Sequence, residues 1–115
     1  MQKTIHITVA EMKYTENGWT VIRPAGSIND IIAQRGKKYH FVQVVSDTET
    51  DNIKYQGIAK NSFIQNAFSN GAIPVYAHVT GKKALKVTFE DVNANARIII
   101  STRRAALRPK YDLEK

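Results

Sequence analysis

The sequence contains no cysteine, which excludes disulfide bonds and thiolate metal sites from its 115 residues. It also has no run of the ~18 apolar residues that a helix needs to cross a bilayer. The first residues, MQKTIHITVAEMKY, show no long apolar stretch ahead of a small-residue cleavage site, so we expect no secretory signal. These absences predict a protein that is neither secreted nor embedded in a membrane. We expect it to act inside the cell, in the cytoplasm, the nucleus or a viral replication site.

Several sequence signatures of catalysis are missing as well. The turn-like stretch GKKALK lacks the spacing of a phosphate-binding Walker loop. His6, His40 and His78 lie far apart, and no pair of them has the spacing of a metal-binding motif. Residues 46–52, SDTETDN, alternate acidic and polar side chains but lack the glycine and the final glutamate of a calcium loop. We therefore interpret this segment as part of a solvated loop.

Acidic residues are scarce, and this is informative. Ten Asp and Glu stand against 17 Lys and Arg, which gives a formal net charge of +7. A small domain with this excess creates a positive field that attracts polyanions, and nucleic acid is the commonest such partner. The alternative is a basic protein that is simply soluble. Hydrophobic residues make up 43%, so one domain over residues 1–110 can form a core, with 111–115 as a short tail.

The hydrophobic pattern predicts an α/β protein with a small mixed sheet and one main helix. Residues 58–71 are typical of that helix, because apolar side chains recur four apart before Gly71. Residues 3–16 are ambiguous, since Ile5, Ile7 and Val9 alternate as in a strand, whereas Gly18 would end a short helix. The expected strands cover residues 19–23, 30–34, 38–46, 72–80 and 84–92. Residues 96–102 form either another strand or the end of an extended region, and residues 47–57 form a polar loop.

The strand 38–46 carries one polar side chain in an apolar run. Alternation places Phe41, Gln43 and Val45 on one face of the strand. A strand this apolar is normally central and covered on both faces, so the amide of Gln43 needs hydrogen-bond partners. A hairpin through Gly36 would bring Asp30 beside the strand. We therefore expect Asp30 and Gln43 to converge near one end of the sheet.

The stretches GWTVIRPAGSINDIIAQRGKKYHFVQVV and NSFIQNAFSNGAIPVYAHV resemble the PD-(D/E)XK superfamily. This is the restriction-endonuclease-like fold, which includes archaeal Holliday junction resolvases and many phage and viral nucleases. The resemblance covers roughly residues 10–90. In that family a strand and loop precede a metal-binding Asp, a hairpin leads to a central strand bearing Glu-x-Lys, and a helix and another strand follow. The resemblance implies a restriction-endonuclease-like α/β fold.

Matched position by position, the resemblance makes Asp30 the metal-binding acid, Gln43 the second acid and Val45 the lysine. Glu11 matches an acid that some members carry on their first helix. Gln43 offers only a neutral oxygen to a divalent cation. Val45 can neither polarise a phosphate nor orient a water molecule, which is the role that the resemblance implies for the lysine.

A cation from elsewhere would have to replace that lysine, and Lys54 and Lys60 are the candidates by sequence proximity. The predicted catalytic set is therefore Asp30, Gln43, Lys54 and Lys60, with Asp30 as the metal ligand. The alternatives are that Asp30 is a turn or cap residue and that Gln43 satisfies buried backbone groups. Val45 is then simply part of the core.

Cations gather at two expected turns and near the C-terminus, where they could contact phosphates. The alternative is that these are charged turns that remain solvated. The predicted nucleic-acid-binding residues are Arg35, Lys37 and Lys38 at the first turn, Lys82 and Lys83 at the second, and Arg103, Arg104 and Arg108 near the C-terminus.

Three hypotheses follow. The first is a DNA-binding protein with a degenerate nuclease fold, catalytically impaired and without a cofactor. The second is an active endonuclease or junction resolvase that depends on Mg²⁺ or Mn²⁺ and uses a migrated lysine. The third is a structural or assembly protein, virus-encoded for example, that acts as a homodimer.

Overall fold

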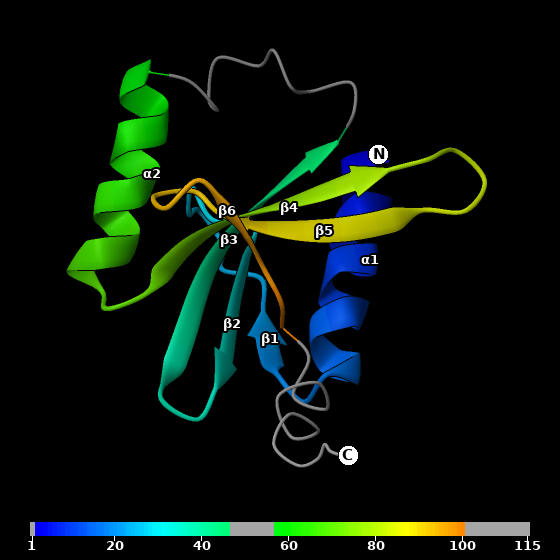
Figure 1. Cartoon of the computed structure of the whole chain (residues 1–115), viewed down its shortest axis with the longest axis horizontal. Coiled ribbons are helices and arrows are strands. Elements are labelled where there is room, and N and C mark those ends of the chain that lie inside the picture. The colour runs from blue at the N-terminus through cyan, green and yellow to red at the C-terminus, as the bar shows by residue number, and fades with distance from the viewer. Residues whose placement is uncertain (1, 47–56, 101–115) are drawn as a thin grey trace.

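A computed structural model describes residues 2–46 and 57–100 of the chain (Figure 1). Within these ranges the polypeptide forms two helices and a six-stranded sheet. In chain order the elements are α1 (Gln2–Glu16), β1 (Thr20–Ile22), β2 (Ile31–Arg35), β3 (Lys38–Ser46), α2 (Gly57–Ser69), β4 (Ile73–Thr80), β5 (Lys86–Asp91) and β6 (Ala96–Ile98). The predicted mixed α/β architecture is confirmed, and α1 is present in addition to the expected main helix α2.

The strands lie in the sheet in the same order as in the sequence, β1 to β6. Neighbours pair antiparallel, except that β3 and β4 are parallel and are connected through α2. The β2–β3 turn precedes β3 and the β4–β5 turn follows β4. Because β3 and β4 run in the same direction, these two turns lie at opposite ends of the sheet, as Figure 1 shows.

The N-terminal segment is a helix because its buried side chains repeat at helical spacing. Ala10 and Tyr14 are fully buried, and Ile7, three residues before Ala10, packs against the same cluster. Ile5, which suggested a strand, is 58% exposed. Gly18 follows the helix with a φ of 87°, a backbone conformation that favours glycine and is common after a helix.

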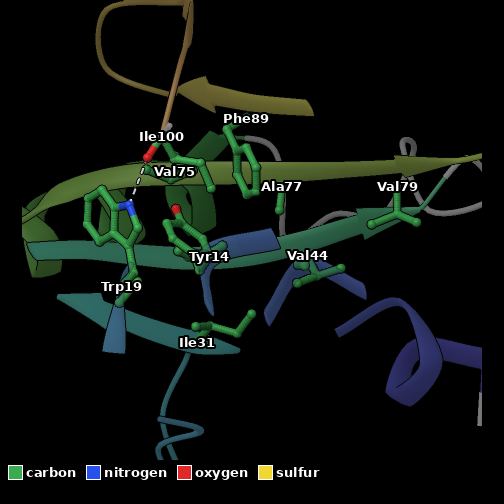
Figure 2. Close-up of a cluster of buried hydrophobic side chains, with 12 residues drawn as sticks. Tyr14, Trp19, Ile31, Val44, Val75, Ala77, Val79, Phe89 and Ile100 are labelled. Atoms are coloured by element: carbon green, nitrogen blue, oxygen red, sulfur yellow. Dashed lines mark hydrogen bonds between the residues drawn. The ribbon is translucent and has the colours of Figure 1, made fainter. Parts of the chain in front are cut away.

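The sheet has one hydrophobic cluster on each face. On the first face, Ala10 and Tyr14 of α1 pack with Val42 and Val44. Figure 2 shows Tyr14 and Val44 in this cluster. Trp19 belongs to this cluster and donates a hydrogen bond from Nε1 to the carbonyl oxygen of Ile100 at 2.9 Å. On the other face, α2 packs against a second cluster that contains Phe41, Val45, Phe63, Ala67, Ala72, Tyr76 and Val92. The predicted alternation of side chains along β3 is therefore confirmed.

The second helix buries only some of its apolar side chains. Phe63 and Ala67 are fully buried, but Phe68 remains 46% exposed. Residues 47–56 of the expected polar loop and all residues after Ile100 lie outside the described ranges. Neither described helix is long and apolar enough to pass through a membrane.

Candidate functional site

Asp30 is attached to the central strand of the sheet immediately before β2 begins. Its backbone N–H donates to the carbonyl oxygen of Val42 at 2.8 Å, and its Oδ2 accepts a hydrogen bond from the N–H of Val44 at 2.8 Å. The carboxylate is therefore positioned by the backbone of β3. The alternative, in which Asp30 only caps its own turn, does not account for these contacts across the sheet.

Gln43 lies on the α2 face of β3 and is only 4% exposed. Its Nε2 donates to the carbonyl oxygen of Ile28 at 2.9 Å, so the amide does satisfy a backbone group of the loop before β2. Its Oε1 is buried and accepts no hydrogen bond from any residue that the structure describes. One end of this side chain is thus fixed, while the other presents an unsatisfied oxygen.

Asp30 and Gln43 line the same open pocket, which has a volume of about 280 Å³. The loop before β2 contributes one wall and the first turns of α2 contribute another. The residues around the pocket are Ser27, Ile28, Asp30, Gln43, Ala59 and Ser62. The structure therefore brings together two of the four predicted catalytic residues.

A second amide attaches the loop to the helix behind this pocket. Asn29, 5% exposed, donates from Nδ2 to Oδ1 of Asn66 on α2 at 3.2 Å, and its backbone N–H donates to Oγ of Ser27 at 3.0 Å. Nothing in the sequence indicates that this loop contacts a helix 37 positions away. Ser27, Asn29 and Ser62 were therefore missed as residues of the site.

The oxygen atoms around the pocket are of the chemical type that a hard divalent cation prefers, although the described residues supply only one negative charge. Asp30 offers a carboxylate, and the unsatisfied Oε1 of Gln43 offers a neutral carbonyl oxygen of the type that Mg²⁺ and Mn²⁺ accept. In the part of the chain that the structure describes, no three His, Asp or Glu side chains gather as a metal-binding group.

No described cation replaces the missing lysine at the pocket. Val45 is 3% exposed and belongs to the same hydrophobic cluster as Phe63 and Ala67 of α2. Lys60 is half-buried on α2 but is not among the residues that line the pocket. Lys54 lies outside the described residues. The catalytic role of either lysine stays a prediction.

A histidine that the sequence did not single out lies next to the valine. His78 is opposite Val45 in the parallel pairing of β3 and β4, which places both side chains on the α2 face. Its Nε2 is 2.8 Å from Oε1 of Glu90, and both side chains are partly exposed. Neither residue lines the pocket around Asp30. Only strand register could have revealed this neighbour, and no sequence motif encodes it.

Glu11 is on α1, where the resemblance expected an acid, but it pairs with an arginine. Nε and Nη2 of Arg23 donate to its two carboxylate oxygens at 2.7 and 2.8 Å. The same Nη2 donates to Oγ1 of Thr8 at 2.9 Å. The bidentate bond with Glu11 raises the pKa of Arg23. This carboxylate therefore links α1 to the segment that follows β1.

The predicted nucleic-acid-binding cations occupy different environments. Lys37 and Lys38 are exposed at the β2–β3 turn, and Lys82 and Lys83 are exposed at the β4–β5 turn at the other end of the sheet. Arg35 is partly buried, and its guanidinium lies 4.6 Å from the centre of the Trp19 ring. The remaining residues of the set, Arg103, Arg104 and Arg108, lie outside the described ranges.

Comparison with known proteins gives a match at the level of structure. No protein-family model matches the sequence, and no curated protein matches it. The structure is similar to that of Archaeoglobus fulgidus Hjc, a Holliday junction resolvase from an archaeal hyperthermophile, with a TM-score of 0.63 and 21% sequence identity. The match covers 81% of this chain and 75% of the resolvase chain. The predicted resemblance to the PD-(D/E)XK superfamily is therefore confirmed at the level of the fold, and the chain has a restriction-endonuclease-like α/β fold.

Proposed function

We propose that this chain binds DNA inside the cell through a degenerate PD-(D/E)XK fold whose cleavage activity is impaired. The observation that carries the proposal is the fold shared with a Holliday junction resolvase in a chain whose net charge is +7. A positive domain of this shape attracts the phosphate backbone without requiring a motif that reads bases. Exposed lysines at the β2–β3 and β4–β5 turns supply part of that charge.

Impaired cleavage is supported by the composition of the pocket. Phosphodiester hydrolysis in this superfamily is expected to need a metal held by more than one acid, and a cation near the scissile phosphate. Asp30 is the sole acid among the described residues that line the pocket, and no lysine or arginine is among them. The position that matches the lysine is Val45, which is covered by α2.

The test is a binding titration followed over a range of salt concentrations. A labelled four-way junction, a duplex and a single strand are titrated with the protein, and fluorescence anisotropy measures the dissociation constant for each. We expect binding at low salt that weakens linearly on a plot of log K against log salt. Negligible affinity for all three DNA forms at low salt would rule the proposal out.

A second candidate function is metal-dependent cleavage, favoured by two observations: Asp30 and Gln43 line the same pocket, and the buried Oε1 of Gln43 has no hydrogen-bond partner among the described residues. Asp30 and Gln43 would hold Mg²⁺ or Mn²⁺, which when bound would polarise a phosphate oxygen. Supercoiled plasmid and four-way junctions are incubated with Mn²⁺ and either the wild type or Asp30→Ala. Nicking that disappears in the variant supports this candidate, whereas nicking that survives, or no nicking by either protein, contradicts it.

A further inference from the structure

A second pocket, of about 290 Å³, lies apart from the one around Asp30. It is located where β3 and β4 begin, since His40 and Ile73 are partners in the parallel register and both line it. His40 contacts Tyr14 of α1, so this pocket is associated with the α1 side of the sheet. The lining residues are Trp19, Arg35, Lys38, His40, Ile73, Ile98 and Ile99.

Arg35 is held rigidly at the wall of this pocket. Its guanidinium lies over the Trp19 ring at 4.6 Å, and Nη1 donates to the carbonyl oxygen of Ile100 at 2.8 Å. A weaker contact joins Nη1 to the carbonyl oxygen of Asn17 at 3.5 Å. Among the described residues, nothing accepts a hydrogen bond from its Nε or Nη2. An arginine held in this way, with two donors that no described residue occupies, is pre-organised for an anion, because little side-chain entropy remains to be lost on binding.

The charge around the pocket is positive. Among the described residues that line the pocket, Arg35 and Lys38 are the charged ones, and none is Asp or Glu. The pKa of His40 is lowered to about 4, mainly by burial and to a smaller extent by the positive charges of Lys38 and Arg35, while Asp91 acts in the opposite direction. The imidazole is therefore neutral at pH 7, and the lysine and arginine dominate the local field.

We propose that this pocket binds a phosphate monoester carried on a body about the size of one nucleoside. A guanidinium fork with a neighbouring ammonium matches phosphate oxygens, and the three isoleucines provide an apolar wall for the attached body. The volume is close to the lower limit of ordinary ligand pockets, which run from about 300 Å³ upward. The ligand has two possible sources. One is the 5′-terminal phosphate of a strand, which rests on the proposed DNA function, and the other is a free sugar phosphate or mononucleotide.

Trp19 provides a direct readout, because it is the chain's single tryptophan and lines the pocket. The full chain is titrated with ribose 5-phosphate, which does not absorb in the tryptophan range, and with ribose, at constant ionic strength. We expect a saturable change in Trp19 fluorescence with the phosphate and none with ribose. In a second arm, 5′-phosphorylated and 5′-hydroxyl forms of one short oligonucleotide compete with ribose 5-phosphate.

Two single-charge variants provide a matched comparison. Lys38 lines the pocket and Lys37, its exposed neighbour at the same turn, does not. Removing a charge-assisted hydrogen bond should make Lys38→Gln bind ribose 5-phosphate about tenfold more weakly, whereas Lys37→Gln should stay within about twofold of the wild type. Equal weakening in both variants would show general attraction to the basic surface and would overturn the inference.

The remaining outcomes separate this inference from the proposed function. If the protein binds four-way junctions but Trp19 does not respond to ribose 5-phosphate, the pocket inference is wrong and DNA binding stands. If Trp19 responds but no DNA form binds, the proposed function is wrong and the pocket takes a free sugar phosphate. Stronger competition by the 5′-phosphorylated oligonucleotide than by its hydroxyl form identifies the strand end as the ligand.

Discussion

Asp30 and Gln43 are both positioned by backbone groups of neighbouring segments. Asp30 accepts from Val44 N–H on β3, and Gln43 donates to the carbonyl oxygen of Ile28 in the loop before β2. Each side chain therefore joins the loop to the strand. In consequence, a substitution at either position tests structure as well as chemistry, and the two effects have to be separated.

Asp30 offers a clean separation. Asp30→Ala removes a charge-assisted hydrogen bond to Val44 N–H, so we expect the free energy of unfolding to fall by about 1.5–3 kcal/mol. Asp30→Asn keeps an oxygen acceptor and should lose less than about 1 kcal/mol. Urea unfolding followed by circular dichroism measures both values. Equal losses in the two variants would show that the charge of the carboxylate, and not its hydrogen bond, stabilises the fold.

His40 predicts a dependence of stability on pH. It is 5% exposed and hydrogen-bonded to the hydroxyl of Tyr14 at 2.9 Å, and burial first, then Lys38 and Arg35, lowers its pKa to about 4. An unfolded histidine titrates near about 6.5, so between these values the unfolded chain binds the proton more readily than the folded chain. The folded state is therefore progressively destabilised as the pH falls from about 6.5 to about 4.

The size of this effect follows from the difference in pKa. As the pH falls from about 6.5 to about 4, the free energy of unfolding should decrease more in the wild type than in His40→Gln, by on the order of 3 kcal/mol. Glutamine keeps a polar group beside Tyr14 but does not titrate. Urea unfolding at pH 7, 5.5 and 4 compares the two proteins. Parallel pH profiles would contradict the expected depression of the pKa of His40.

At the scale of elements, the packing of α2 against the sheet determines which side chains position 45 can accommodate. Phe63 and Ala67 of this helix are fully buried against the sheet, and Val45 lies in the same cluster with an exposed fraction of 3%. A lysine at this position would have to bury its ammonium or displace the helix. A valine therefore suits this position, because α2 covers the place that the resemblance assigns to the lysine.

Restoring the lysine tests this arrangement. Val45→Lys should lower the free energy of unfolding by on the order of 3–5 kcal/mol, because a buried ammonium shifts its pKa by several units. Val45→Ala is the control and should cost about 2 kcal/mol through lost burial and a small cavity. Thermal and urea unfolding measure the losses, and a Mn²⁺ nicking assay accompanies them. A stable Val45→Lys protein that nicks DNA would show that position 45 opens to the pocket after all.

The sequence predicted those parts of the element pattern that depend on local periodicity. The alternation in residues 38–46 gave the two faces of β3, and the Gly36 turn gave the hairpin that brings Asp30 to Gln43. The turn has Gly36 at a φ of 62°, which a two-residue hairpin loop favours at its first position. The mixed α/β class follows from such local patterns, whereas the restriction-endonuclease-like fold was implied by the resemblance; the structural match confirms that fold.

The remaining features depend on contacts between distant segments, which periodicity does not encode. Residues 3–16 fitted both a strand and a short helix, and only burial of Ala10 and Tyr14 against the sheet decides for α1. Ser62 reaches the pocket because α2 packs beside the loop before β2. Arg35 resembled an exposed turn cation, but its position over Trp19 requires the carbonyl oxygen of Ile100, 65 residues away.

At the scale of the whole molecule, the four exposed lysines of the predicted nucleic-acid-binding set form two separate pairs. Lys37 and Lys38 lie at the turn before β3, and Lys82 and Lys83 lie at the turn after β4, which runs parallel to β3. β3 has nine residues, so at about 3.3 Å per residue the two turns are separated by roughly 30 Å. One turn of B-DNA is about 34 Å long and contains about ten base pairs. A single duplex of that length can therefore reach both turns.

This spacing predicts how charge removal acts on DNA of different lengths. Two double variants are compared on a 20-base-pair duplex. One combines Lys37→Gln with Lys38→Gln, and the other combines Lys82→Gln with Lys83→Gln. Each should reduce the magnitude of the slope of log K against log salt by about 2. The fourfold variant should lower it by about 4, since widely separated contacts add. An eight-base-pair duplex is too short for both turns, so the wild-type slope on it should be smaller by about 2. Anisotropy titrations at several salt concentrations measure each slope, and a slope unaffected by one of the two pairs would place the DNA at one end of the sheet only.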